Sequence, residues 1–169
     1  MTIQLYAQPY DISAEGFFFS SAGDYRRKAA KLRNAHGEPV EEFEIQFIDG
    51  EQIDAELARA IDLSQASFAF FLERAAEWNE QQKTAVIIAV PECGMHFDLE
   101  TDDPDDLDID IYRLDSLRDL AIEFVEEGLF GEIPERLQFY LDYDAIARDL
   151  AMDYSEAVIA GERLIYRCG

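Results

Sequence analysis

The hydrophobic and polar positions of the first fifty residues follow two different periods. Apolar residues alternate with polar ones over residues 3–7 and again over 40–48, and the segment 17–20 is Phe-Phe-Phe-Ser. Alternation of this kind predicts strands with one buried face. Between these strands, residues 22–34 carry apolar positions at helical spacing. The pattern predicts an N-terminal β-β-α-β unit over residues 1–50.

Helical spacing dominates the next stretch and predicts a mainly helical middle unit over residues 51–97. Apolar residues recur every three or four positions over 53–61 and 68–78, which predicts two amphipathic helices. Residues 84–90 then form a continuous apolar run that ends at Pro91. Such a run fits either a strand buried on both faces or a buried helical turn, and its length favours the strand.

The remaining residues, 98–169, predict an acidic linker followed by an α+β unit. A strand is expected over 109–114, and helices are expected to begin after Ser116 and Asp142, whose side chains can cap them. Residues 157–166 predict a terminal hairpin with Gly161 at a positive φ. We therefore expect an α+β protein built as an elongated chain of three small units.

Charge changes this picture more than any other feature of the composition. The chain has 37 Asp and Glu against 14 Lys and Arg, a net charge of −23, and it is 49% hydrophobic. That apolar content is enough for a folded core, so a disordered acidic tail is excluded. Nucleic acid and anionic lipid are poor partners for such a protein. A basic protein surface, a cation or solubility in high salt remains as the explanation.

The acidic residues are concentrated rather than spread. Residues 98–149 hold 18 acidic and 4 basic residues, a net charge of −14. A uniformly solvated surface would distribute its charge evenly, so this concentration favours a surface that binds a basic partner. The candidate partner-binding carboxylates are Asp98, Glu100, Asp102, Asp103, Asp105, Asp106, Asp108, Asp110, Asp115, Asp119, Glu123, Glu126, Glu127, Glu132, Glu135, Asp142, Asp144 and Asp149.

Two adjoining motifs within this acidic region resemble the C-terminal signature of the ArdA antirestriction proteins. The first is Glu-Glu-Gly-Leu-Phe-Gly-Glu-Ile-Pro-Glu at 126–135, and the second is Leu-Asp-Tyr-Asp-Ala-Ile-Ala-Arg-Asp-Leu at 141–150. The second motif matches the family's antirestriction motif, with Asp144 where the family has Glu. Its residues are Leu141, Asp142, Tyr143, Asp144, Ala145, Ile146, Ala147, Arg148, Asp149 and Leu150.

The resemblance implies a function. ArdA proteins are acidic mimics of B-form DNA that help incoming DNA to evade host defence. They occupy the DNA groove of type I restriction-modification enzymes, formed by the specificity and modification subunits. The resemblance further implies a homodimer with a contact at 141–150, no cofactor, and no catalytic activity of its own.

Two other classes of function stay open on the residues alone. The same acidic surface could bind a different basic DNA-binding protein. An enzyme could use paired carboxylates, either Glu126 with Glu127 or Asp142 with Asp144, as acid and base. Neighbours one or two positions apart point to different sides of a helix, and no Ser/His/Asp or Cys/His group is evident, so we expect no enzyme.

The helix expected at 22–34 carries the chain's one basic patch. Five of the 14 basic residues lie between positions 26 and 33. A nucleic-acid contact would face a strongly repelling background, so an ion-pair role within or between protomers is favoured. Glu41, Glu42 and Glu44 are the acidic residues expected to neutralise some of these cations.

Neither of two partial metal motifs is complete, so no metal site is expected. Cys93 and His96 supply only half of a zinc site. Asp106, Asp108 and Asp110 are spaced like the start of a calcium loop, but Ile111 stands where that loop needs Gly.

Cellular location is expected to be cytoplasmic. Two cysteines are typical of a reducing compartment, and the N-terminus shows no export leader. No apolar run is long enough to predict a membrane span.

Overall fold

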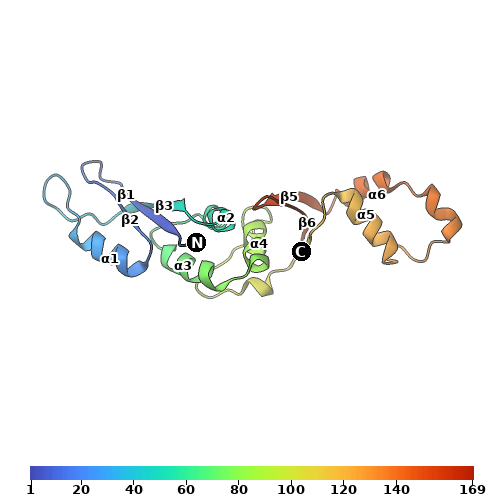
Figure 1. Cartoon of the computed structure of the whole chain (residues 1–169), viewed down its shortest axis with the longest axis horizontal. Coiled ribbons are helices and arrows are strands. Elements are labelled where there is room, and N and C mark those ends of the chain that lie inside the picture. The colour runs from blue at the N-terminus through green and yellow to red at the C-terminus, as the bar shows by residue number, and fades with distance from the viewer. The chain divides into compact units, whose positions relative to one another are not determined.

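The computed structural model describes all 169 residues and confirms the α+β class (Figure 1). The chain divides into two compact units, Met1–Leu107 and Asp108–Gly169, each with its own three-stranded antiparallel sheet. The three-unit division expected from the sequence stays a prediction.

The first unit contains three strands and four helices. These are β1 (Gln4–Pro9), β2 (Phe17–Phe19), α1 (Ala22–Lys31), β3 (Phe43–Asp49), α2 (Gln52–Ala60), α3 (Phe68–Glu77) and α4 (Glu80–Ala89), followed by a short 3-10 helix, η1 (Pro104–Asp106). The strand order is β2-β1-β3, which leaves β3 at one edge of the sheet. The predicted β-β-α-β order of residues 1–50 is confirmed.

Aromatic side chains form much of the core of this unit. Phe19 of β2, Tyr25 of α1 and Phe68 of α3 pack with ring centroids about 5 Å apart, and Phe17 and Phe43 join the same group. Phe19 and Phe68 are almost fully buried. Aromatic clusters of this kind stabilise through burial and through edge-to-face ring contacts. The cluster fixes α1 and α3 on the sheet.

Residues 84–90 are not a strand, and the sequence prediction was wrong on this point. Residues 84–89 belong to helix α4 and Val90 is its C-cap. The helix begins at a capping box in which Asn79 and Gln82 each bond the other's backbone N–H. Every residue from Lys83 to Ala89 is buried. A helix that is buried all round has no polar face, so its sequence lacks the 3.6-residue period and looks like a buried strand.

The acidic segment 98–106 is packed onto the rest of the first unit through its apolar residues rather than forming a free linker. Leu99 and Pro104 are buried. Arg74 of α3 donates to the carbonyl oxygens of Leu99 and Glu100 at 2.8 and 3.2 Å. The segment is thus held to α3 at defined positions.

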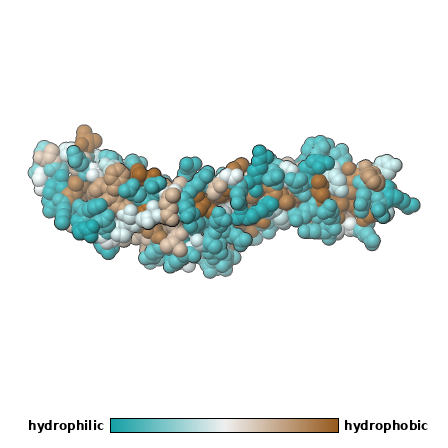
Figure 2. Space-filling model, in the orientation of Figure 1, coloured by the Kyte–Doolittle hydropathy of each residue, from teal (hydrophilic) through white to brown (hydrophobic).

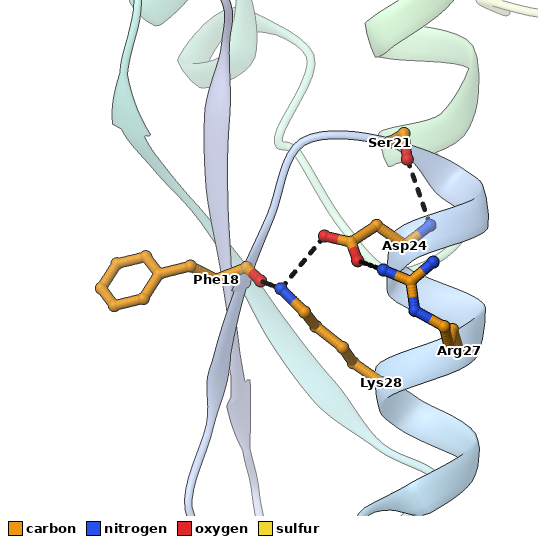
Figure 3. A network of polar contacts seen from close by, with 5 residues as sticks. All are labelled: Phe18, Ser21, Asp24, Arg27 and Lys28. Atoms are coloured by element: carbon orange, nitrogen blue, oxygen red, sulfur yellow. Dashed lines mark hydrogen bonds and ion pairs between the residues drawn. The ribbon is translucent and has the colours of Figure 1, made fainter.

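The basic residues of helix α1 have a different ion-pair partner from the expected one. Asp24, one turn before them, forms ion pairs with Arg27 and with Lys28, the latter at 3.1 Å (Figure 3). Lys28 also donates to the carbonyl oxygen of Phe18 at 2.7 Å. Partners three and four positions apart lie on one helix face, so Asp24 reaches both cations. The expected pairing with residues 41–44 is absent.

The second unit is a sheet with two helices and a terminal hairpin. Its elements are β4 (Ile109–Tyr112), α5 (Leu117–Glu126), the 3-10 helix η2 (Glu135–Tyr140), α6 (Tyr143–Leu150), β5 (Ser155–Ile159) and β6 (Glu162–Cys168). The strand order is β4-β6-β5. Leu120, Phe124 and Ile165 form the buried core, and Tyr112 and Tyr154 pack against it.

Both predicted helix starts and the predicted hairpin are confirmed. The Ser116 hydroxyl accepts from the Asp119 backbone N–H at 3.2 Å, and the Asp142 carboxylate accepts from the Ala145 N–H at 3.0 Å. The hairpin turns at Ala160 and Gly161, both with positive φ, of 51° and 82°. Two consecutive positive φ values match the right-handed twist of the flanking strands.

The structure also bears on the membrane span and on the two cysteines. No helix combines the length and the apolar character that crossing a bilayer requires. Neither cysteine is a free thiol.

Candidate acidic partner-binding surfaces

The structure divides the 18 candidate carboxylates between the two units. Six lie on the first unit, in the packed segment 98–106, and twelve lie on the second unit, from Asp108 to Asp149. Sixteen of the 18 are exposed, and the other two, Asp119 and Glu123, are half-buried. We call the two groups the 98–106 acidic surface and the 108–149 acidic surface.

The 98–106 acidic surface is organised by its own aspartates. Asp98 accepts from the Glu100 N–H at 2.9 Å, Asp102 from the Asp98 N–H at 2.8 Å, and Asp103 from the Asp105 N–H at 2.9 Å. Each of these bonds uses one carboxylate oxygen to close a tight turn. The aspartate side chains therefore hold the backbone of this segment in place, and their negative charges stay on the surface.

On the second unit, helix α5 carries a buried apolar face and a row of acidic residues beside it. Leu120, Ala121 and Phe124 are buried against the sheet. Asp119 and Glu123, both half-buried, border this buried face, and the exposed Glu126 continues the row at the end of the helix. A step of four residues advances about 6 Å along a helix axis, so these carboxylates form a row of like charges.

Helix α6 lies against α5 and adds further carboxylates. Arg118 of α5 forms an ion pair with Asp144 of α6 at 3.2 Å, and its guanidinium carbon lies 5.7 Å from the ring centroid of Tyr143. Asp142 caps α6, and Asp149 is exposed on its last turn. Arg118 thus ties the two helices together at the motif 141–150.

Very little of this charge is neutralised. Among all 18 candidate carboxylates, only Asp144 has a basic side chain within 4.0 Å. The second unit has 15 acidic and 6 basic residues, and Arg113 pairs with Glu162, outside the candidate set. Carboxylates that are exposed and unpaired repel one another, so a complementary basic surface would relieve that repulsion.

A cavity of about 650 Å³ follows the C-terminal end of α5. Its lining includes Glu126, Glu127, Glu132 and Tyr143. The enzyme alternative would use carboxylates of this region. However, Asp142 is occupied in capping and Asp144 in its ion pair with Arg118, so that pair is held in structural roles. No group of three His, Cys, Asp or Glu side chains is arranged to hold a metal ion.

Exposed apolar side chains adjoin the acidic ones, and the sequence analysis missed them. Phe139 is 93% exposed and Tyr140 is 83% exposed, and Leu129, Phe130 and Leu137 are also exposed. All five lie between the end of α5 and the start of α6. In Figure 2 the surface over these helices, at the right, is mostly hydrophilic and is broken by hydrophobic patches. The sequence signal for this patch was a group of apolar residues between two helices that follow neither a helical nor a strand period.

A family model described as antirestriction protein (ArdA) matches residues 26–162, most of both units. The chain belongs to the ArdA family. The match includes the second half of α1, the middle helices, both acidic surfaces and the motif at 141–150, so it extends the resemblance seen in the C-terminal third. No curated protein matches the chain. An antirestriction role, exercised on restriction enzymes, follows from membership of this ArdA family.

Proposed function

We propose that this ArdA protein inhibits type I restriction-modification enzymes by acting as a mimic of B-form DNA. The observation that carries the proposal is the state of the 18 candidate carboxylates, of which 16 are exposed and only Asp144 is ion-paired. The target is the DNA groove formed by the specificity and modification subunits. Cleavage is blocked, and methylation is blocked with it because both need bound DNA.

The mechanism rests on how proteins hold duplex DNA. B-DNA carries about one charge per 1.7 Å of axis, and proteins gain most of their non-specific affinity by placing Lys and Arg against it. Carboxylates fixed on α5, α6 and the turns of 98–106 can engage the same cations. No base is read in this interaction, so inhibition does not depend on the recognition sequence of the enzyme.

Homodimer formation is part of the proposal. The motif at 141–150 lies next to the exposed side chains of Phe139 and Tyr140. Apolar side chains that are exposed beside a polar rim are typical of protein interfaces. Burial of this segment between two copies in the cytoplasm would join two 108–149 acidic surfaces in one inhibitor.

Neutralising three carboxylates on the second unit tests the proposal. In the test variant Asp115→Asn, Glu123→Gln and Glu126→Gln are combined, and in a control Glu15→Gln, Glu38→Gln and Glu73→Gln are combined on the first unit. Both variants lose three charges. We expect the test variant to need roughly tenfold more protein to halve DNA cleavage by a type I enzyme, about 1.4 kcal/mol. Equal losses for both variants would show that only total charge matters.

The test also separates a second class of partner. If the protein protects no DNA from type I enzymes but still binds a basic DNA-binding protein through the 108–149 acidic surface, that protein is the target instead. Pull-downs with the test and control variants distinguish the two results.

A further inference from the structure

The outer edge of β3 in the first unit is open, and it lies beside a cavity. β3 pairs only with β1, so one side of the strand faces no other strand. A cavity of about 630 Å³ runs beside residues 43–47, and Ala55, Ala58 and Leu63 also line it. In Figure 1 β3 and α2 are neighbours. Five residues of strand span roughly 17 Å, enough for a short extended segment.

The direction of the peptide groups follows from the register. The Tyr10 N–H donates to the carbonyl oxygen of Glu42 at 3.2 Å. The backbone N–H and C=O groups of Glu42 therefore point toward the side of β1. Alternate residues of an antiparallel strand face the same neighbour, so Glu44 and Gln46 face β1 as well. The peptide groups of Phe43, Ile45 and Phe47 therefore point toward the cavity.

At one end of this open edge, a side-chain amide already forms the hydrogen bonds that a neighbouring strand would form. The Gln65 amide oxygen accepts from the Phe43 N–H at 3.1 Å, and its nitrogen donates to the Glu41 carbonyl oxygen at 2.6 Å. A side-chain amide has the same donor and acceptor as a backbone peptide group. Gln65 thus closes one end of the edge, and the N–H and C=O groups of Ile45 and Phe47 stay unpaired along the cavity.

We propose that this edge binds an extended basic segment of a protein partner, which adds a fourth strand to the sheet beside β3. Strand addition of this kind takes its affinity from backbone hydrogen bonds and its specificity from alternate side chains. Side chains of the added strand that lie beside Ile45 would enter the cavity next to Ala58 and Leu63, where small apolar groups fit. Side chains beside Glu44 would face solvent, where a Lys or Arg forms a cross-strand pair.

Charge selects this occupant over a second copy of the chain. β3 carries Glu44 and Asp49 and follows Glu41 and Glu42. Edge-to-edge pairing of two copies would place like charges opposite one another, which destabilises a sheet. An acidic segment is disfavoured for the same reason. The favoured segment alternates basic with small apolar residues.

The test uses the full chain and a blocked synthetic peptide of about seven residues that alternates lysine and valine, a usual strand length. Amide NMR shifts report the site, and a titration gives the Kd. We expect the largest shifts at Ile45 and Phe47. Two N-methylated peptides are compared, one methylated on the N–H groups that would face β3 and one on the N–H groups that would face away. Only the first should bind more weakly, by about tenfold.

Reversing one charge gives an independent arm. Glu44→Lys should weaken binding of the lysine peptide by about tenfold, whereas Glu38→Lys, an exposed residue away from the cavity, should leave it unchanged. Equal binding of both N-methylated peptides, or shifts confined to 108–149, would overturn the proposal, because either result means that the peptide is attracted by charge alone. The N-methylated arm uses the unaltered protein, so it does not depend on the folding of a variant.

Discussion

The ammonium nitrogen of Lys83 lies 2.7 Å from Oδ1 of Asp54, and both side chains are more than nine-tenths buried. The pair joins α4 to α2, the two helices that pack most closely in the first unit. Because a buried charge without a partner costs several kcal/mol, each member of the pair requires the other. Helix α4 thus carries one fixed cation at its contact with α2.

Replacing Lys83 by Met should therefore destabilise the protein by about 3–5 kcal/mol, because Asp54 is left charged and buried. Urea unfolding at neutral pH measures the loss. The exposed Lys31→Met serves as the control, with an expected change below about 1 kcal/mol. Combining Lys83→Met with Asp54→Leu should recover most of the loss, since no charge then remains buried. A loss below about 1 kcal/mol for Lys83→Met alone would contradict this account.

The sequence predicted the elements that carry local signals. Ser116 and Asp142 were recognisable as N-caps because each is a short polar residue placed before an apolar period. The hairpin was recognisable from Gly161. Helix α4 was misread because its buried residues show no period, although Asn79 just before the helix and Gln82 at its third position form a capping box.

Long-range pairings could not be predicted. Gln65 reaches Phe43 across 22 positions, and Arg74 reaches Leu99 across 25. Nothing in the local pattern marks either partner, because these bonds depend on how helices and strands pack. The same limit applies to the acidic residues. Their number and concentration were readable, but their exposure and lack of partners needed the structure.

Tyr112 should make the stability of the second unit sensitive to alkaline pH. Burial raises the pKa of the Tyr112 phenol, and the neighbouring Tyr154 adds to the shift. A raised pKa in the folded state means that the stabilising contribution is complete below the unfolded value of about 10. It is lost as the pH rises through the folded value. Tyr112→Phe should therefore reduce the fall in the urea midpoint between about pH 9 and 11.

Tyr10→Phe is the matched control for this experiment, because Tyr10 is 65% exposed. It should leave the alkaline fall unchanged. Tyrosinate absorbance, followed in parallel, should show one late-titrating phenol fewer in Tyr112→Phe. An identical alkaline profile for wild type and Tyr112→Phe would show that the burial of Tyr112 has no effect on its titration.

Asp142 has two roles in this account, and two substitutions separate them. Asn is as good an N-cap as Asp, so Asp142→Asn should leave the free energy of unfolding within about 0.5 kcal/mol while removing the charge. Asp142→Ala should lose about 1 kcal/mol because the Ala145 N–H loses its acceptor. If Asp142 contacts the restriction enzyme, both variants inhibit cleavage less well than the wild-type protein, and by the same factor. Full inhibition by Asp142→Asn would remove Asp142 from the binding surface.

The most direct test of the DNA-mimic proposal is whether this protein and DNA exclude each other on one enzyme. Labelled protein is titrated with a type I core of specificity and modification subunits, and unlabelled duplex carrying the recognition site is then added, at about 50 and 200 mM salt. We expect stoichiometric binding that duplex displaces completely and that weakens strongly at the higher salt. A ternary complex with DNA, or binding that salt leaves unchanged, would contradict the mimic.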